Sequence, residues 1–352
     1  KDLLKLFRDK SNVNMAKIFV TRPIPEVGIK LLRDKGYEVV VNESAIDRAA
    51  AREEMIEALR QAQDEGKPFN AILSVLTDKI TADVMEAGLS SLKIIANYAV
   101  GFDNIEAEEA KKRNIMITNT PGVLTNTVAE HTFALMLAIA HRVSEADRFS
   151  RAGKYKAWGP QLLLGTDLSG KTLGVVGLGR IGSRVAYHAV RGFDMKIIYT
   201  DEKRNEQFEK EFSAGGGKEF NAKYTENLEE LLSQSDFVSI HVPLLPTTIH
   251  LINEDNLGFM KTSAYLINTS RGPIVDEKAL ARALREKWIR GAALDVFEFE
   301  PEITPLLKEL DNVILTPHIA SATEETRNAM AEIAAKNIIE ALEGRIPPNL
   351  VS

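Results

Sequence analysis

The stretch KTLGVVGLGRIGSRVAYHAVRGFDMKIIYTDEKR, residues 171–204, decides the fold of this chain. It opens with a short apolar run, turns through three glycines and continues with apolar residues at helical spacing. A second apolar run, residues 195–200, follows and leads into Asp201. An apolar strand, a tight turn, an amphipathic helix and another strand form a βαβ unit. We therefore predict one βαβ unit here.

The three glycines have separate tasks if a dinucleotide binds at this turn. Gly177 permits the sharp turn, Gly179 lets the backbone approach a pyrophosphate, and Gly182 lets the helix lie close to the strand. The N-terminus of the helix presents unpaired N–H groups to the anion. The strand before this GxGxxG motif and the helix after it make a dinucleotide site a specific prediction.

The acidic residue after the second strand bears on which dinucleotide binds. Asp201 lies nineteen residues after Gly182, where a carboxylate would accept hydrogen bonds from the adenosine ribose. A carboxylate there repels the 2′-phosphate of NADP, so the sequence favours NAD(H). Lys203 and Arg204 follow and offer positive charge to such a phosphate, which leaves NADP open as the less favoured cofactor.

Length and composition fit a soluble globular protein of two domains. The chain has 352 residues, 44% hydrophobic and 27% charged, and a net charge of −6, which argues against nucleic acid as a partner. It has no cysteine, which excludes disulfides, thiol catalysis and cysteine metal sites, and we predict no metal. No apolar run reaches the length of a membrane span and no signal peptide is visible, so we expect a cytoplasmic location without membrane contact.

The first fourteen residues, KDLLKLFRDKSNVN, stand apart from the rest. They precede Met15 and a clean strand, so we expect a leader or an expression remnant. A short amphipathic helix that binds a membrane surface or a partner is the alternative.

Strands and helices alternate on both sides of the βαβ unit. Residues 17–117 show the rhythm of a parallel, doubly wound sheet, and residues 228–318 supply further strands of a dinucleotide domain. Between them, residues 127–152 predict one long helix, buried in a core or between subunits. Residues 202–224 are polar and glycine-rich and predict a surface excursion. A final helix over residues 321–343 is expected to return to the first domain.

Three polar side chains stand near the ends of late apolar strands. Arg271 precedes a glycine and suits a carboxylate, which it can grip with two parallel hydrogen bonds. Glu300 lies between Phe299 and Pro301 and could hold an imidazole, and His318 closes an apolar strand. Each has an ordinary structural explanation alone, but together at the edge of a dinucleotide sheet they favour catalysis.

The chain resembles the D-isomer-specific 2-hydroxyacid dehydrogenases. The resemblance runs from about Met15 to the end and is most like the glyoxylate/hydroxypyruvate reductase branch. It implies two doubly wound α/β domains: a discontinuous flavodoxin-like substrate domain, residues 15–118 with 320–352, and a Rossmann NAD-binding domain, residues 119–319. The motifs that carry it, in order, are ANYAVGFDNI, ITNTPGVLT, GLGRIG, HVPLLPTT, LINTSRGPIVDEKAL, GAALDVFEFEP and TPHIAS.

The resemblance also implies roles for single residues. Arg271 would bind the substrate carboxylate and carbonyl, His318 would be the acid/base, and Glu300 would pair with His318. Glu298 is a nearby glutamate that would not take this role. Substrate-binding residues would be Leu76, Thr77, Val100, Gly101 and Arg271. Cofactor-binding residues would be Gly177, Gly179, Arg180, Ile181, Gly182, Asp201, Val242, Pro243, Thr248, Thr269, Arg271, Asp295 and His318. Val128 and Leu245 depart from residues common in relatives.

The implied activity is NADH-dependent reduction of a small 2-oxo acid to the D-2-hydroxy acid, with glyoxylate and hydroxypyruvate favoured. D-lactate, 2-ketogluconate and 3-phosphoglycerate dehydrogenases of the same family stay open. A non-enzymatic NAD-sensing scaffold is the rival from another class, because fold alone does not settle function. The family's habit and the apolar helix predict a homodimer, in which the loop around Trp158 can reach the neighbour's active site.

Overall fold

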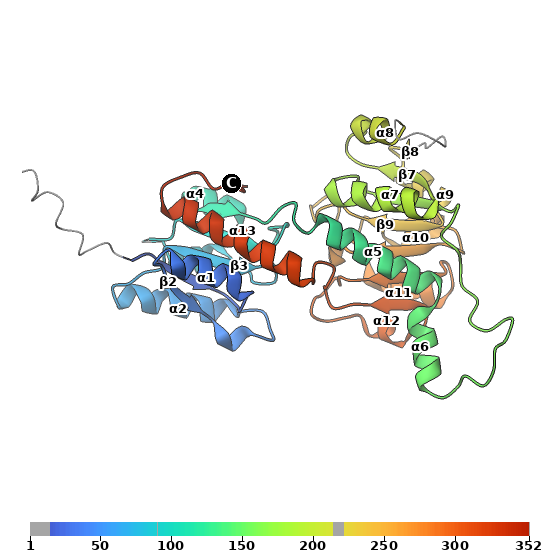
Figure 1. Cartoon of the computed structure of the whole chain (residues 1–352), viewed down its shortest axis with the longest axis horizontal. Helices are drawn as coiled ribbons and strands as arrows, with labels where there is room; N and C mark the ends of the chain where they lie inside the picture. Colours follow the sequence, from blue (N-terminus) through green and yellow to red (C-terminus); the bar gives the residue numbers. More distant parts are fainter. Residues whose placement is uncertain (1–14, 90, 214–221, 352) are drawn as a thin grey trace, which may run out of the picture. The chain divides into compact units, whose positions relative to one another are not determined.

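The chain folds as two compact units. The computed structural model describes residues 15–89, 91–213 and 222–351, so the predicted leader at residues 1–14 lies outside the described ranges. One unit runs to Val123 and resumes at Thr323, and the other is Leu124–Ala322. Figure 1 shows the first unit in blue and cyan with the red C-terminal helix. The substrate and NAD-binding roles expected for these units stay predictions at this point.

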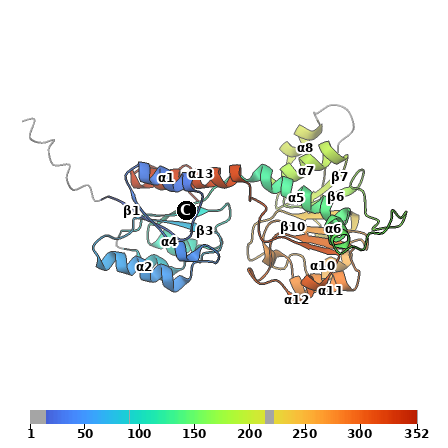
Figure 2. The same cartoon turned by 60° about the horizontal axis from the view of Figure 1, so that its bottom comes forward.

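The first unit is a parallel sheet with helices on both faces. Its strands follow the order β2-β1-β3-β4-β5, all parallel, which is the flavodoxin-like order. Helices α1 and α13 cover one face, and α2 and α4 cover the other (Figure 2). The bounds are β1 Lys17–Val20, α1 Glu26–Asp34, β2 Glu38–Val41, η1 Glu43–Ala45, α2 Arg52–Asp64, β3 Ala71–Val75, α3 Ala82–Ala87, β4 Ile94–Tyr98, α4 Ala107–Lys112, β5 Met116–Thr118 and α13 Glu324–Leu342.

The second unit is a larger parallel sheet in the order β12-β11-β10-β9-β6-β7-β8. The bounds are α5 Thr125–Ala140, α6 Val143–Arg151, β6 Thr172–Val176, α7 Arg180–Phe193, β7 Lys196–Thr200, α8 Glu206–Ser213, β8 Ala222–Tyr224, α9 Leu228–Gln234, β9 Phe237–Ile240, α10 Glu254–Phe259, β10 Tyr265–Asn268, η2 Gly272–Ile274, α11 Glu277–Arg285, β11 Gly291–Leu294, α12 Pro305–Glu309 and β12 Val313–Leu315. The order of strands reverses between β6 and β9, and ligands of such sheets bind at this switch point.

Both sheets confirm the predicted fold class, and the βαβ unit of residues 171–204 is β6, α7 and β7. The core of the second unit has two layers because successive strand residues point to opposite faces. Val175 packs in the layer that contains α5 and α7, whereas Val176 packs in the layer that contains α9, α10 and α11. Strands that are buried on both faces read as continuous apolar runs, as this sequence does.

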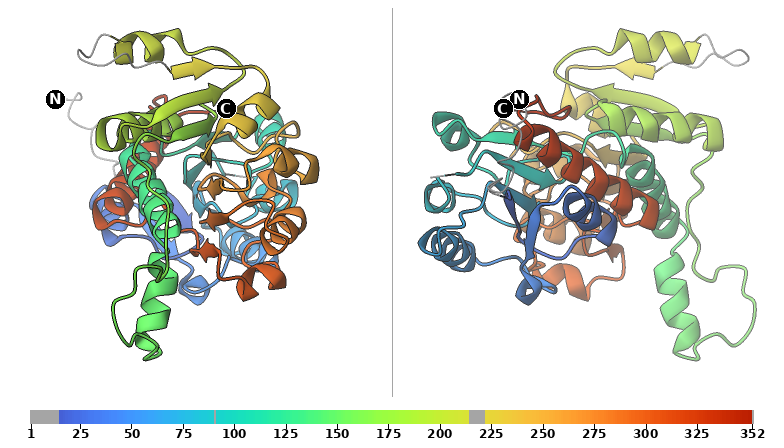
Figure 3. Two further views of the ribbon diagram at one scale, coloured as in Figure 1. Left: turned by 90° about the vertical axis from the view of Figure 1, so that its right-hand side faces the viewer. Right: turned by 60° about the vertical axis from the view of Figure 1, so that its left-hand side comes forward.

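The long helix predicted over residues 127–152 is wrong at one point. The helix ends as α5 at Ala140, and α6 begins at Val143 after Arg142 adopts a left-handed conformation, φ 55°. The Ala140 carbonyl accepts a hydrogen bond from the N–H of Thr166, 2.9 Å away, instead of continuing the helix. α5 buries its apolar side chains inside its own unit, while α6 has no buried residue and stands away from the sheet (Figure 3).

The surface excursion predicted over residues 202–224 is also wrong in part. Its first half forms α8, and its end forms β8, which extends the sheet beside β7. The glycine run at residues 215–217 lies outside the described ranges. In the described ranges, no helix is long and apolar enough to cross a membrane, and no group of three or more His, Cys, Asp or Glu is placed to hold a metal ion.

Candidate active site

The glycine turn after β6 has the shape that a dinucleotide requires. Gly177 has φ 93°, and a Cβ on it would lie 2.8 Å from the Val242 side chain. A Cβ on Gly182 would lie 2.1 Å from the Gly177 carbonyl oxygen, so only glycine lets α7 approach the strand this closely. A Cβ on Gly179 would meet no heavy atom of the described chain within 4 Å, so the space over that residue is open. The turn therefore fits a pyrophosphate.

The start of α7 is free for an anion. Gly179 is its N-cap residue and offers no side-chain cap to the first turn, which begins with Arg180 and Ile181. Uncapped N–H groups at a helix N-terminus attract a phosphate through hydrogen bonds and the helix dipole.

Asp201 lies beside this turn, as the sequence predicts. One carboxylate oxygen, Oδ2, accepts a hydrogen bond from the N–H of Leu178 at 2.7 Å, and Oδ1 accepts one from the N–H of Glu202 at 2.7 Å. These donors fix the carboxylate at the carboxyl end of β7, next to the glycine turn.

The cofactor residues predicted after β9 and β10 occupy the same edge of the sheet. The Thr248 hydroxyl donates to the Pro243 carbonyl at 2.8 Å and accepts from the N–H of Leu245 at 2.8 Å, which closes a turn. The Val242 carbonyl accepts from the Ser270 hydroxyl, which ties the two loops together. Thr269 is buried, and its hydroxyl lies 3.1 Å from that of Thr132 on α5.

His318 and Glu300 form a pair at this edge. Nδ1 of His318 lies 3.0 Å from Oε2 of Glu300, and about a quarter of each side chain is exposed, 25% and 24%. The other carboxylate oxygen, Oε1, accepts from the N–H of Phe297 at 2.9 Å, which fixes the orientation of Glu300. An imidazole held through Nδ1 by a carboxylate keeps Nε2 for chemistry.

Asp295 fixes the loop that carries His318. Its Oδ1 accepts from the Thr316 hydroxyl at 2.7 Å and from the N–H of Ile319 at 2.8 Å, and its Oδ2 accepts from the N–H of Ala320 at 2.7 Å. The Asp295 carbonyl accepts from the N–H of His318 at 2.8 Å, and His318 is held in a left-handed conformation, φ 54°. The contact with the cofactor that the resemblance implies for Asp295 stays a prediction.

The Asp295 carboxylate is fully buried. Burial alone would raise its pKa, but hydrogen bonds from His131, Thr316 and the N–H groups of residues 319 and 320 outweigh burial and hold the pKa below its ordinary value. His131 on α5 lies 3.4 Å from Oδ1 through Nε2. Sequence reasoning did not find His131, because nothing local links a helix residue to a strand end so distant in the chain.

Arg271 follows β10 and is half-buried. Its Nη1 donates to the Ser270 carbonyl at 2.9 Å, and its own carbonyl accepts from the side-chain amide of Asn268 at 2.9 Å. A Cβ on Gly272 would overlap the Phe297 carbonyl at 1.8 Å, so this glycine lets the Arg271 loop pass next to the loop of Glu300.

Two carboxylates, Glu277 and Glu298, anchor the Glu300 loop in a contact that the sequence did not reveal. Glu277 is 1% exposed, and its two oxygens accept from the N–H groups of Glu298 at 2.8 Å and Thr304 at 3.2 Å. Oε2 of Glu298 in turn accepts a hydrogen bond from the N–H of Glu277 at 3.1 Å, and its Oε1 lies 2.7 Å from Nε2 of His250. In the sequence, Glu277 is an acidic residue at the start of an amphipathic helix, where acidic residues are usually exposed to solvent. The sequence therefore did not indicate that Glu277 is buried.

The substrate residues predicted in the first unit lie in two loops at the carboxyl edge of its sheet. The side chain of Asn104 donates to the carbonyls of Val75 and Asp78 at 3.1 and 2.9 Å, and the side chain of Asn97 donates to the Gly101 carbonyl at 2.9 Å. This buried pair connects the loop of Leu76 and Thr77 with the loop of Val100 and Gly101. Among the described residues, no backbone carbonyl accepts from the N–H groups of Val100 or Gly101.

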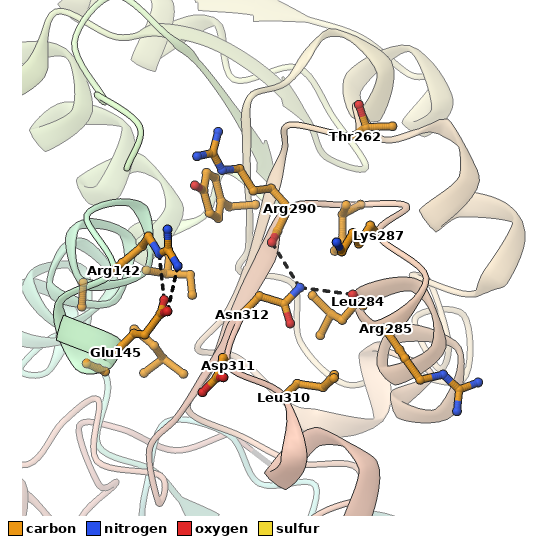
Figure 4. A pocket seen from close by; sticks show the side chains of 16 residues that line it. Arg142, Glu145, Thr262, Leu284, Arg285, Lys287, Arg290, Leu310, Asp311 and Asn312 are labelled. Carbon is orange, nitrogen blue, oxygen red and sulfur yellow. Dashed lines mark hydrogen bonds and ion pairs between the residues drawn. The ribbon is translucent and has the colours of Figure 1, made fainter. Parts of the chain in front are cut away.

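A separate cavity of about 560 Å³ lies at the opposite, amino edge of the larger sheet (Figure 4). Arg142 pairs there with Glu145 at 2.7 Å, and the Asn312 amide donates to the carbonyls of Leu284 and Arg290. None of the residues predicted for cofactor or substrate lines it. The carboxyl edge, where β6, β7, β9, β10, β11 and β12 end, therefore holds all the predicted cofactor and catalytic residues.

Comparison with known proteins agrees with this arrangement. The family model for the D-isomer specific 2-hydroxyacid dehydrogenase NAD binding domain matches residues 133–320. A glyoxylate reductase from Korarchaeum cryptofilum is 50% identical over 339 residues, which is 96% of each chain. A crystal structure of a Thermus thermophilus protein matches with a TM-score of 0.84 and 40% identity over 96% of this chain and all of that one.

A second solved structure carries ligands. The NADPH-dependent glyoxylate/hydroxypyruvate reductase of Sinorhizobium meliloti, in complex with NADP and malonate, matches with a TM-score of 0.80 and 31% identity over 96% of this chain and 97% of that one. The family model covers over half of the chain, and the relatives are matched over nearly their whole length. The chain therefore belongs to the D-isomer-specific 2-hydroxyacid dehydrogenases, in their glyoxylate reductase branch, and is an NAD(P)-dependent oxidoreductase.

Proposed function

We propose that this enzyme reduces glyoxylate to glycolate and hydroxypyruvate to D-glycerate with NADH, and that His318 is its acid/base. The observation that carries the proposal is the 3.0 Å contact between His318 and Glu300 at the sheet edge that also holds the glycine turn. Two glyoxylate reductases that are 50% and 48% identical to this chain support the choice of substrate.

The chain's own residues fit the cofactor. The open space over Gly179 and the uncapped start of α7 suit the pyrophosphate, and Asp201 suits the hydroxyls of the ribose. We assign the loops of Val242 to Thr248, Thr269 and Asp295 to the nicotinamide half. When bound, NADH supplies the hydride that reduces the α-carbon of the 2-oxo acid.

His318 supplies the proton. With Nδ1 bonded to Glu300, Nε2 faces away from that carboxylate and can donate a proton to the substrate's keto oxygen as the hydride arrives. Before the proton is donated, Glu300 stabilises the charged imidazole, and it fixes the orientation of the ring. In the reverse direction the same nitrogen takes the proton from the hydroxyl group.

Arg271 binds and polarises the substrate in this proposal. A guanidinium offers two parallel donors to a carboxylate and stabilises the negative charge that develops on the keto oxygen. The N–H groups of Val100 and Gly101 are assigned to the substrate carboxylate as well, with Leu76 and Thr77 beside the substrate's side chain. A small pocket would favour two- and three-carbon acids, and each additional methylene changes preference by only about 1–3 kcal/mol.

The test is the rate of NADH consumption with four substrates side by side: glyoxylate, hydroxypyruvate, pyruvate and 3-phosphohydroxypyruvate. We expect the highest kcat/KM with glyoxylate or hydroxypyruvate. A clear preference for pyruvate or for 3-phosphohydroxypyruvate would move the enzyme to another branch of the family. NADH binding with no turnover of any 2-oxo acid would instead support a sensing scaffold.

We also propose that the enzyme is a homodimer formed through α6 and the loop after it. This segment buries none of its α6 residues and exposes large apolar side chains, Trp158 at 80% and Leu164 at 58%. Apolar surface of this kind is typical of an interface. Light scattering on the wild type and on Trp158→Ser tests it: we expect a dimer that the substitution weakens, and a wild-type monomer at micromolar concentration would refute it.

A further inference from the structure

We propose that Glu209 sets the preference for NAD(H) over NADP(H) by withholding Arg204 from the 2′-phosphate of NADP. The inference rests on the proposed dinucleotide site at the glycine turn and adds a residue that determines cofactor choice. Arg204 is the arginine in the loop after β7, three residues beyond Asp201. A guanidinium in this loop is the group that would bind a 2′-phosphate.

Arg204 is paired with Glu209 through two of its nitrogen atoms. Nε lies 3.0 and 3.1 Å from the two carboxylate oxygens of Glu209, and Nη2 lies 2.7 Å from Oε2. The side chain of Arg204 is 59% exposed, so it could swing toward a ligand, whereas that of Glu209 is only 16% exposed and stays in place. The pair therefore places the positive charge against the protein's own carboxylate.

Glu209 is held from beneath by a buried tyrosine. The hydroxyl of Tyr199, on β7, donates to Oε1 of Glu209 at 2.6 Å, and Tyr199 is fully buried against the rings of Phe208 and Tyr224. The same hydroxyl accepts from the N–H of Asn205 at 3.0 Å. Glu209 is thus a fixed anion, anchored on the sheet itself.

The loop between Asp201 and α8 is tied to the glycine turn. The side-chain amide of Asn205 donates to the Leu178 carbonyl at 3.3 Å, and Asp201 accepts from the N–H of Leu178. Arg204 therefore lies in the chain between Asp201 and Asn205, both of which contact the glycine turn. Asp201 disfavours a 2′-phosphate by repulsion, and Glu209 disfavours it by pairing with Arg204.

The experiment compares NADPH with NADH in four proteins: wild type, Glu209→Gln, Arg204→Ala and the double variant. The measured quantity is the ratio of kcat/KM for NADPH to kcat/KM for NADH with one 2-oxo acid, alongside the Kd of each nucleotide from fluorescence titration. Because both nucleotides are measured on the same sample, a change in the folded fraction cancels from the ratio.

Glutamine keeps the shape of Glu209 but loses its charge, so Arg204 becomes available. We expect Glu209→Gln to raise the NADPH/NADH ratio by about threefold to fivefold, because the gain cannot exceed the worth of a largely exposed ion pair. The double variant should return to the ratio of Arg204→Ala, because the gain acts through the guanidinium. Glu206→Gln is the matched control: it removes the same charge from α8 at a residue that pairs with Lys210 and acts on Arg204 only through a weak Coulombic interaction, so the ratio should change much less than in Glu209→Gln.

Three outcomes overturn the proposal. An unchanged ratio in Glu209→Gln shows that Arg204 is not withheld. A gain that persists in the double variant, or that Glu206→Gln reproduces, shows that only the negative charge near the loop matters. If the wild type binds neither nucleotide, the proposed dinucleotide site fails and this inference falls with it, whereas NADH binding with an unchanged ratio refutes Glu209 alone.

Discussion

Nδ1 of His318 lies 3.0 Å from Oε2 of Glu300, across eighteen residues of chain. Neither residue is in a helix or strand, so each depends on other groups for its position. Buried Asp295 holds the His318 loop, and buried Glu277 holds both ends of the Glu300 loop. Two carboxylates that accept backbone N–H groups thus place the proposed acid/base pair on the edge of a parallel sheet.

Glu277 tests this positioning. In Glu277→Gln one of its two acceptor oxygens is lost, which leaves a buried N–H of Glu298 or Thr304 without its partner. We expect the free energy of unfolding to fall by about 1–3 kcal/mol, and kcat to fall while KM for NADH stays near the wild-type value. Urea unfolding and steady-state rates measure both. If stability falls and kcat per folded enzyme does not, Glu277 supports the fold alone.

Arg271→Lys tests carboxylate recognition. Lysine keeps the charge but loses the planar fork that grips two oxygens. We expect KM for the 2-oxo acid to rise at least tenfold and kcat to fall, while the Kd of NADH changes little. An equal loss in NADH affinity would mean that Arg271 serves the cofactor rather than the substrate.

Two glycines of the turn after β6 give a pair of variants in which one is the control for the other. In Gly182→Ala the new Cβ would clash with the Gly177 carbonyl, whereas in Gly179→Ala it meets only open space. We expect Gly182→Ala to unfold at lower urea and Gly179→Ala to fold as the wild type does, while both bind NADH more weakly. Urea unfolding and NADH fluorescence separate the two effects, and unchanged NADH affinity in Gly179→Ala would place the pyrophosphate elsewhere.

His241 gives a prediction about pH. Desolvation lowers the pKa of its ring to about 3, and its Nε2 lies 2.8 Å from the Ser239 hydroxyl. An unfolded histidine takes up its proton near pH 6.5, so the unfolded chain binds more protons between pH 6.5 and 3. The neutral ring of His241 therefore leaves the free energy of unfolding at its full value above pH 6.5, and this free energy decreases as the pH falls from 6.5 toward 3.

The measurement is urea unfolding at pH 7 and pH 5. A whole proton would lower the free energy of unfolding by about 1.4 kcal/mol per pH unit, and we expect less because part of the residue is exposed. His241→Gln should flatten this slope, and His141→Gln, at an exposed histidine, should not. An unchanged slope in His241→Gln would show that the ring is protonated in the folded chain.

The sequence predicts the fold because local patterns decide it. Period-two and period-3.6 runs give the strands and helices, and GLGRIG with Asp201 gives the βαβ unit, since each is read within about thirty residues. The break at Arg142 was not predictable in this way, because it depends on the N–H of Thr166 from a returning loop. The sequence around α8 is polar on most positions and gave no clear helical period.

The residues of the candidate site were likewise predictable only where a short stretch of sequence identifies them. Arg271, Glu300 and His318 could be named because each follows an apolar strand in a motif. Glu277, His131 and Glu209 could not, because their roles consist of hydrogen bonds to residues on other elements. A buried carboxylate that accepts backbone N–H groups looks, in one dimension, like any charged residue on a solvated helix.

The most direct test of the acid/base pair is the rate of glyoxylate or hydroxypyruvate reduction by His318→Ala and Glu300→Gln, measured with saturating NADH. We expect a loss of about two or more decades in kcat for His318→Ala and a smaller loss for Glu300→Gln, with the Kd of NADH near the wild-type value in both. A His318→Ala enzyme that keeps its kcat while the wild type reduces these acids would show that His318 is not the acid/base.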